Sequence, residues 1–329
     1  MWKYNSTLLI FLIFITACGK KENKLSDKSE MSINVNIERT GFIQSDKDIK
    51  LYYDIRGKGE DTLVMVNGGP GLSLEVMAPD WKELENDYTM IFYDQRGSGR
   101  STLPDTTTID KTLHINRFVE DLEELRRYFS LKEMTLIGHS GGTMIIANYV
   151  IKYETNVKKI LFIGSVPPFK GDFAERVLEN EKRFYEEGEF DKYYEYEKQF
   201  LSGRNFPESC IEMWNVLLKT RVASGIPVDV IKGNHCLPPW ESAVYGYKYS
   251  MNLVFDLLGD WDYRPYIQNI EVPVLIIHGK EEVFPMDMIE EWERSFPNAR
   301  LEKIEGAAHF PHVEKPTIVW PIIRKFLKE

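Results

Sequence analysis

The sequence predicts an α/β fold, in which a mostly parallel sheet is flanked by helices on both faces and carries an inserted, mostly helical cap. Short apolar runs recur along the chain and are too continuous for strands with one exposed face. Segments with helical periodicity separate these runs, which is the order that builds a parallel sheet. Between residues 167 and 255 the alternation stops, and Tyr, Glu and Trp become frequent without a clear buried strand. This interruption predicts the cap.

The core elements can be assigned in chain order. Two N-terminal segments alternate apolar and polar residues and predict an antiparallel pair, residues 33–44 and 48–55, with a turn at 45–47. Buried strands are predicted at residues 62–66, 89–93, 134–137, 159–163, 272–278 and 300–304. Helices are predicted around Trp81 and Leu84 and at residues 114–128, 143–153, 286–295 and 317–327. In 114–128 the apolar residues recur at spacings of three and four, which places them on one face.

The cap interrupts the core, so the core is expected in two parts, residues 36–166 and 256–329. The cap itself is residues 167–255. Its first part, 173–200, has a helical and heavily charged pattern. Four prolines then divide the rest into short pieces: Pro207, Pro227, Pro238 and Pro239.

The N-terminus has the pattern of an export signal. Lys3 precedes an apolar run at residues 8–15, which is far shorter than the roughly 20 residues needed to cross a bilayer. Ile-Thr-Ala-Cys at residues 15–18 resembles the lipobox of bacterial lipoproteins. We expect residues 1–17 to be a signal peptide, Cys18 to be lipidated, and residues 18–35 to form a flexible tether. This predicts attachment to a membrane of the bacterial cell envelope; a plain signal peptide with an incidental cysteine is the alternative.

Composition excludes several classes of protein. The formal net charge is −10 and there is no basic cluster, so a nucleic acid is not an expected partner. The three cysteines, Cys18, Cys210 and Cys236, are too few for a disulfide scaffold and have no zinc-site spacing. The sequence leaves open whether Cys210 pairs with Cys236. It also leaves the oligomeric state open.

The strongest motif is Gly-His-Ser-Gly-Gly at residues 138–142. It lies between a predicted strand and a predicted helix, which is the context of a nucleophile elbow. Such a turn is strained and needs small residues on both sides of the serine. We therefore predict that Ser140 is a nucleophile.

A nucleophilic serine needs a base, and the base needs an orienting acid. In this kind of fold the acid and then the histidine follow the serine in the chain. His309 comes directly after the last predicted strand and is preferred over His312, which begins a helix. The acid is predicted to be Glu282 by counting from Gly279, whereas counting back from the next proline gives Glu281.

The oxyanion of such a reaction needs two N–H donors. The residue after the nucleophile, Gly141, is one predicted donor. The other should come from the Asn-Gly-Gly-Pro-Gly loop at residues 67–71, with Gly69 preferred over Gly68. Glycines let this backbone approach a substrate closely.

From about Gly41 onward the chain resembles the α/β-hydrolase superfamily and, within it, the prolyl iminopeptidase-like serine peptidases. The family's Asp-Gln-Arg-Gly-Ser-Gly-Arg-Ser stands unchanged at residues 94–101, and its His-Gly-Gly-Pro-Gly appears with Asn67 in place of histidine. The Gly-His…Glu-x-Pro ending corresponds to residues 308–316. Two further departures are the glutamates where aspartate is usual and the absence of tryptophan after the serine. Arg96 is expected to pair with a carboxylate and brace the oxyanion loop.

The resemblance implies a serine hydrolase that works through an acyl-enzyme and needs no cofactor or metal. The expected substrate is a short peptide or amide with an N-terminal proline or small apolar residue. Trp240 and Glu241 resemble a cap pair whose glutamate contacts the substrate amine, although Glu241 could equally be a solvated acid. A carboxylesterase or lactonase is the alternative on the same machinery, and a non-catalytic binding lipoprotein is the alternative from another class.

Overall fold

A computed structural model describes residues 38–329, apart from residue 70, residues 183–188, residue 238 and residues 252–255. The predicted signal peptide, Cys18 and the predicted tether lie outside the described residues. Within the described part of the chain, no helix is both long and apolar enough to cross a membrane.

The centre of the fold is an eight-stranded sheet in the order β1-β2-β4-β3-β5-β6-β7-β8. The strands are β1 (Thr40–Asp46), β2 (Ile49–Gly57), β3 (Thr62–Val66), β4 (Thr89–Tyr93), β5 (Met134–His139), β6 (Val157–Ile163), β7 (Val274–Gly279) and β8 (Ala299–Ile304). The pairs β1–β2 and β2–β4 are antiparallel, and every pair from β4 to β8 is parallel. This confirms the predicted mostly parallel sheet. The first turn lies two residues later than predicted, because β1 bulges between Gln44 and Asp46 and continues to Asp46.

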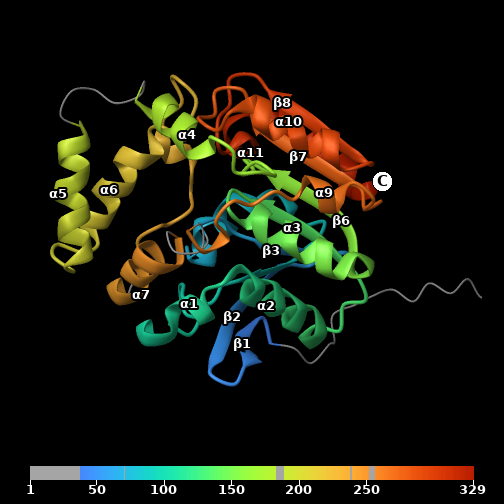
Figure 1. The fold of residues 1–329 in the computed structure, drawn as a ribbon, viewed down its shortest axis with the longest axis horizontal. Coiled ribbons are helices and arrows are strands. Elements are labelled where there is room, and N and C mark those ends of the chain that lie inside the picture. The colour runs from blue at the N-terminus through green and yellow to red at the C-terminus, as the bar shows by residue number, and fades with distance from the viewer. Residues whose placement is uncertain (1–37, 70, 183–188, 238, 252–255) are drawn as a thin grey trace, which may run out of the picture. The chain divides into compact units, whose positions relative to one another are not determined.

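Both faces of the sheet are covered, which explains why the central strands are apolar throughout. Along β3, Leu63 and Met65 belong to one apolar cluster and Val64 to the other. The face that carries Leu63 and Met65 packs against η2 (Ala78–Leu84) and α12 (Pro316–Lys328). The face that carries Val64 packs against α2 (Ile115–Tyr128), α3 (Gly142–Tyr153) and α10 (Met286–Ser295). The predicted helix around Trp81 is the 3₁₀-helix η2. Figure 1 shows α2 and α3 side by side next to the sheet.

The inserted segment is mostly helical, as predicted. It contains α4 (Phe173–Glu181), α5 (Glu189–Leu201), α6 (Glu208–Leu218), η5 (Val228–Val230), α7 (Trp240–Tyr245) and the π-helix η6 (Gly246–Met251). The predicted helical stretch 173–200 thus contains two helices, with residues 183–188 between them outside the description. α5 and α6 lie side by side (Figure 1). The remaining short helices are η1 (Leu74–Val76), η3 (Thr106–Thr108), α1 (Ile109–Thr112), η4 (Glu154–Asn156), α9 (Arg264–Ile267) and α11 (Pro311–Glu314).

A disulfide joins Cys210 of α6 to Cys236, in the loop before α7. Both cysteines are buried, and they close a loop of chain with a sequence separation of 26. The sequence left open whether Cys210 pairs with Cys236, and the structure shows the pairing. The bond fastens this loop to α6 next to the rings of Trp214 and His235, which are tilted by 33° with centroids 4.3 Å apart.

The Asp-Gln-Arg motif braces the fold differently from the prediction. Arg96 does pair with a carboxylate, that of Asp121 in α2, through bonds of 2.7 and 2.6 Å, and both side chains are buried. The residues that brace the loop after β3 are its neighbours. Asp94 accepts the Leu74 N–H at 2.6 Å, and the Gln95 amide donates to the Asn67 carbonyl at 2.9 Å.

Candidate active site

The turn between β5 and α3 has the backbone geometry of a nucleophile elbow. Ser140 has a φ of 51°, in the left-handed region that non-glycine residues rarely adopt. A Cβ at Gly142 would come within 2.3 Å of the Val66 carbonyl oxygen, and one at Gly138 within 2.7 Å of Ile146. Gly142 is therefore required sterically, because it faces backbone, whereas a side chain at residue 138 would require the Ile146 side chain to move. The tight turn fixes the Ser140 side chain at the carboxyl end of β5, as the sequence predicts.

The loop after β3 lies against Ser140. A Cβ at Gly68 would be 2.8 Å from the Ser140 Cβ, so only glycine allows this approach. Asn67 holds the loop in shape by donating its side-chain amide to the Leu72 carbonyl at 2.6 Å. Gly68 and Gly69 both line the cavity that contains Ser140. The assignment of Gly69 and Gly141 as oxyanion donors stays a prediction.

His309 is paired with Glu282. The imidazole Nδ1 lies 2.6 Å from the Glu282 Oε2, and both residues are buried. The other carboxylate oxygen, Oε1, accepts the backbone N–H of Val283 at 2.8 Å, which fixes the orientation of the carboxylate. His309 and Ser140 line the same cavity. The structure therefore brings the three predicted residues into one site.

The surroundings of Glu282 keep its carboxylate ionised. Burial alone would raise the pKa of Glu282, but the neighbouring His309, through its charge and hydrogen bond, and then Arg221 and His278 lower that pKa to about 2. Glu282 is therefore ionised at neutral pH. An ionised carboxylate on Nδ1 fixes the imidazole tautomer that leaves Nε2 free to accept a proton.

The two rival residues have other positions. Glu281 accepts the backbone N–H of Ser224, in the cap, at 3.0 Å. His312 is buried between the rings of Trp81 and Trp320, with centroids 5.1 and 5.8 Å away. Burial lowers the pKa of His312 to about 3, so it is a neutral core residue.

Glu314 is a residue whose role the sequence did not reveal, although it was part of the Glu-x-Pro motif. Its buried carboxylate accepts the backbone N–H groups of Ala308 and Phe310, on either side of His309, at 3.0 and 2.9 Å. It also accepts the N–H of Ala223, in the cap, at 2.8 Å. One side chain thus holds the His309 loop and joins it to the cap.

Glu314→Gln is expected to lower kcat about tenfold and to lower the melting temperature. The amide offers one acceptor oxygen, so its NH₂ group must face one of the backbone N–H donors, which costs about the energy of an unmade buried hydrogen bond. The check is kcat for a neutral ester together with thermal unfolding. Glu305→Gln is the matched control, because Glu305 lies on the same loop with its side chain 77% exposed. Equal kcat and melting temperature in the two variants would rule out this role.

A cavity of about 380 Å³ opens over Ser140 and His309. Besides Ser140 and His309, the core lines it with Gly68, Gly69, Leu72, Val76, His139, Val166, Phe284 and Phe310. The cap lines it largely with apolar and aromatic side chains. The cap residues are Phe173, Tyr193, Trp214, Leu217, Leu218, Arg221, His235, Tyr247 and Met251. The cap therefore forms about half of the wall on which the selection of a substrate depends.

Arg221 is the one lysine, arginine or carboxylate side chain among the described residues that line this cavity. Its guanidinium pairs with Glu181 at 2.5 Å and lies over the Phe284 ring, 5.6 Å from its centroid. Its backbone carbonyl accepts the His309 N–H at 3.1 Å. No sequence pattern singled out Arg221, because its place depends on how the cap folds back onto the core.

The structure does not bring Trp240 and Glu241 to the cavity. Glu241 is exposed on the first turn of α7, and neither residue is among the described residues that line the space around Ser140. Trp240 instead lies against Gly203, where an added Cβ would be 3.1 Å from the indole ring. The predicted contact between Glu241 and a substrate amine therefore has no support in this geometry.

Comparison with known proteins agrees with the fold. The sequence model of a family described as "alpha/beta hydrolase fold" matches residues 61–316. The proline iminopeptidase of Heyndrickxia coagulans is 27% identical over 290 residues, covering 84% of this chain and 93% of that protein. The proline iminopeptidase of Saccharolobus solfataricus is 26% identical over 302 residues, which cover 85% of this chain and 90% of that protein.

Solved structures share the fold at lower identity. The crystal structure of a proline iminopeptidase from Mycobacterium smegmatis has a TM-score of 0.65 at 17% identity, covering 88% of this chain and 98% of that one. An esterase from Exiguobacterium antarcticum also has a TM-score of 0.65, at 21% identity, and the match covers 88% of this chain and 99% of the esterase. At these identities the likeness concerns the fold alone.

Proposed function

Because the chain belongs to the α/β-hydrolase family, we propose that it is a serine hydrolase that acts through an acyl-enzyme. The observation that carries the proposal is the 2.6 Å bond between His309 and Glu282 beside the elbow serine. Such a pairing has no evident use in a protein that only binds. We therefore favour an enzyme over a non-catalytic binding lipoprotein.

In the proposed mechanism, the Ser140 Oγ attacks the substrate carbonyl while the His309 Nε2 takes the hydroxyl proton. Glu282 stays ionised and stabilises the imidazolium that forms. The backbone N–H groups of Gly69 and Gly141 are proposed to hold the oxyanion. His309 then gives its proton to the leaving group, and a water molecule, activated by the same histidine, hydrolyses the acyl-enzyme.

The substrate is proposed to be a short peptide or amide with an N-terminal proline or small apolar residue. The similarity to the two proline iminopeptidases over most of their length supports it. An ester substrate is the second candidate. It is favoured by the described wall of the cavity, which presents the cation Arg221 and no carboxylate to compensate a substrate ammonium group.

Side-by-side hydrolysis of a proline arylamide and a short neutral acyl ester separates the two candidates. An aminopeptidase should turn over the arylamide with the higher kcat/KM, and blocking the proline nitrogen should remove that activity. Turnover of the ester alone would promote the esterase. Ser140→Ala supplies the background rate for both substrates, and failure of both would reject the hydrolase proposal.

A further inference from the structure

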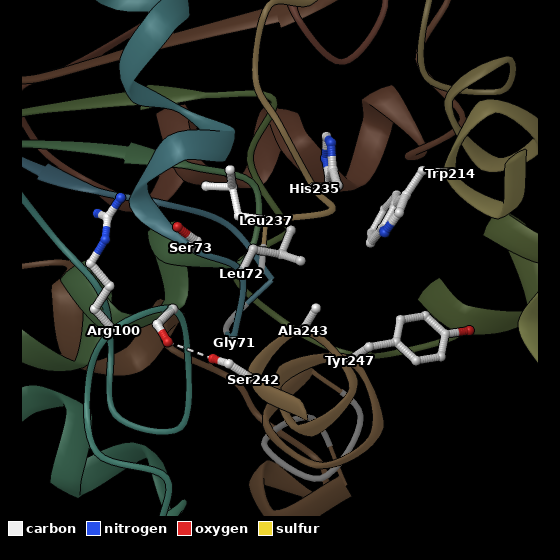
Figure 2. A pocket seen from close by; sticks show the side chains of 11 residues that line it. Gly71, Leu72, Ser73, Arg100, Trp214, His235, Leu237, Ser242, Ala243 and Tyr247 are labelled. Atoms are coloured by element: carbon white, nitrogen blue, oxygen red, sulfur yellow. Dashed lines mark hydrogen bonds between the residues drawn. The ribbon is translucent and has the colours of Figure 1, made fainter. Parts of the chain in front are cut away.

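A second chamber adjoins the cavity over Ser140. Its volume is about 190 Å³, and the two share Leu72, Trp214, His235 and Tyr247 as lining residues. Figure 2 shows this chamber, with Trp214 and Tyr247 on one side and Arg100 on the opposite side. The two cavities therefore lie next to each other, with the four shared side chains at their common boundary.

The wall of the second chamber is apolar along most of its length. Leu72, Leu237 and Ala243 lie between the aromatic side and Arg100 (Figure 2). Ser242 does not offer its proton to a ligand, because its hydroxyl donates to the Gly99 carbonyl at 2.5 Å. Burial lowers the pKa of His235 to about 4, so this ring is neutral at pH 7.

Arg100 is the only lining residue of the chamber, among those described, that carries a charge at pH 7. The backbone of Arg100 is held in place, because its N–H donates to the buried Asp94 carboxylate at 2.7 Å. Its guanidinium lies over the Tyr52 ring, 4.6 Å from the centroid, which holds the plane of the group.

The Arg100 guanidinium is weakly paired. It makes one long contact of 3.4 Å with the Glu75 Oε1, while the other oxygen of Glu75 binds Arg56 at 2.9 Å. Glu75 is thus shared between two arginines, and the Arg100 side chain is 43% exposed. A guanidinium has five N–H donors in a planar fork, so most of those of Arg100 remain for a ligand.

We propose that the second chamber binds the leaving part of the substrate and that Arg100 holds a carboxylate at its far end. A planar guanidinium binds a carboxylate through two parallel hydrogen bonds, and the apolar walls suit the side chain between the carboxylate and the scissile bond. This inference rests on the proposed hydrolase function. For a peptide substrate, the carboxylate is that of the C-terminus of a short chain.

The reaction balances without another reactant. Attack by Ser140 breaks the bond between the acyl carbon and the leaving nitrogen or oxygen, and His309 protonates that atom. The released product then carries an amine or hydroxyl at one end and its carboxylate, bound to Arg100, at the other. Water completes hydrolysis of the acyl group.

The test measures inhibition of neutral-ester hydrolysis by matched pairs of short Pro-Leu peptides, each as the free acid and as the C-terminal amide. The wild-type protein is expected to bind the free acid roughly fivefold more tightly at low salt, as for a partly exposed ion pair. Added salt should reduce this preference. Arg100→Gln should bring the two inhibition constants together, and Arg100→Lys should restore part of the difference.

Arg127→Gln is the matched control, because Arg127 lies on α2 with its side chain 56% exposed, and it should keep the wild-type preference. Equal binding of acid and amide by the wild-type protein would overturn the inference, and so would a preference that survives in Arg100→Gln. Thermal unfolding confirms that each variant is folded. If the wild-type protein hydrolyses no ester and does not react with a fluorophosphonate, the proposed function itself has failed, which is a distinct result.

Discussion

Ser140→Ala is expected to abolish both substrate turnover and labelling by a fluorophosphonate probe. The probe reacts with a serine only when the hydroxyl is activated, so labelling reports the nucleophile without knowledge of the substrate. Loss of the nucleophile in a triad typically lowers kcat by about 10⁴-fold or more. A residual rate far below the wild-type rate is compatible with this, because the oxyanion donors and the binding cavity remain.

The change removes one oxygen atom and keeps the Cβ on the strained backbone, so Ser140→Ala should stay folded. A melting temperature close to that of the wild-type protein would confirm it. Thr143→Ala provides a second check on the elbow, because the Thr143 hydroxyl donates to the Ser140 carbonyl at 2.7 Å and is not the reacting group. Undiminished turnover in Ser140→Ala would mean that another residue is the nucleophile.

Glu282→Gln is expected to lower kcat by about 10³- to 10⁴-fold, as when a triad acid becomes an amide. The amide no longer stabilises the imidazolium, and its NH₂ group can hold the imidazole in the wrong tautomer. Because the pKa of Glu282 is about 2, the wild-type carboxylate is ionised throughout the range from pH 5 to 9. The carboxylate itself does not titrate in that range, so the loss should be present at every pH measured.

Glu281→Gln is the matched control, since it makes the same change at the neighbouring residue. An amide oxygen can still accept the Ser224 N–H, so kcat should change little. Kinetic measurements on both variants from pH 5 to 9 check the pair of expectations. A larger loss in Glu281→Gln than in Glu282→Gln would transfer the role of the acid to Glu281.

The parts of this site that the sequence predicted well depend on strong local signals. The strand before Ser140 is buried on both faces, and the tight turn leaves no room for a side chain at residue 142, so both leave a clear pattern. His309 was found because it follows the last strand directly. These features need no knowledge of distant contacts.

The choice between Glu281 and Glu282 could not be made from spacing, because a shift of one residue in a short turn decides which side chain meets the imidazole. Side-chain length adds to the difficulty, since a glutamate reaches one methylene further than the aspartate usual in this family. In the structure it is Glu282 whose carboxylate lies 2.6 Å from the His309 imidazole, which supports Glu282 as the proposed acid. The Oε1 bond to the Val283 N–H shows how the turn aims it.

The cap was the least predictable region. Its helices are held by contacts between segments far apart in the chain, such as the disulfide between Cys210 and Cys236, and these leave no periodic pattern. Because these contacts leave no pattern, the sequence could not show that Glu241 lies away from the cavity. The positions of Arg221 and Arg100 on the cavity walls could not be predicted for the same reason. The lipid anchor at Cys18 stays a prediction, because that residue lies outside the described structure.

The bonds between the cap and the catalytic loop bear on how such a protein can diverge. Three backbone groups of residues 221–224 join the cap to the core: the Arg221 carbonyl binds the His309 N–H, and the Ala223 and Ser224 N–H groups bind Glu314 and Glu281. The cap is therefore not an independent module that can be exchanged to change specificity. A transplanted cap without an equivalent segment would change the walls of the cavity and remove part of the backbone support of His309.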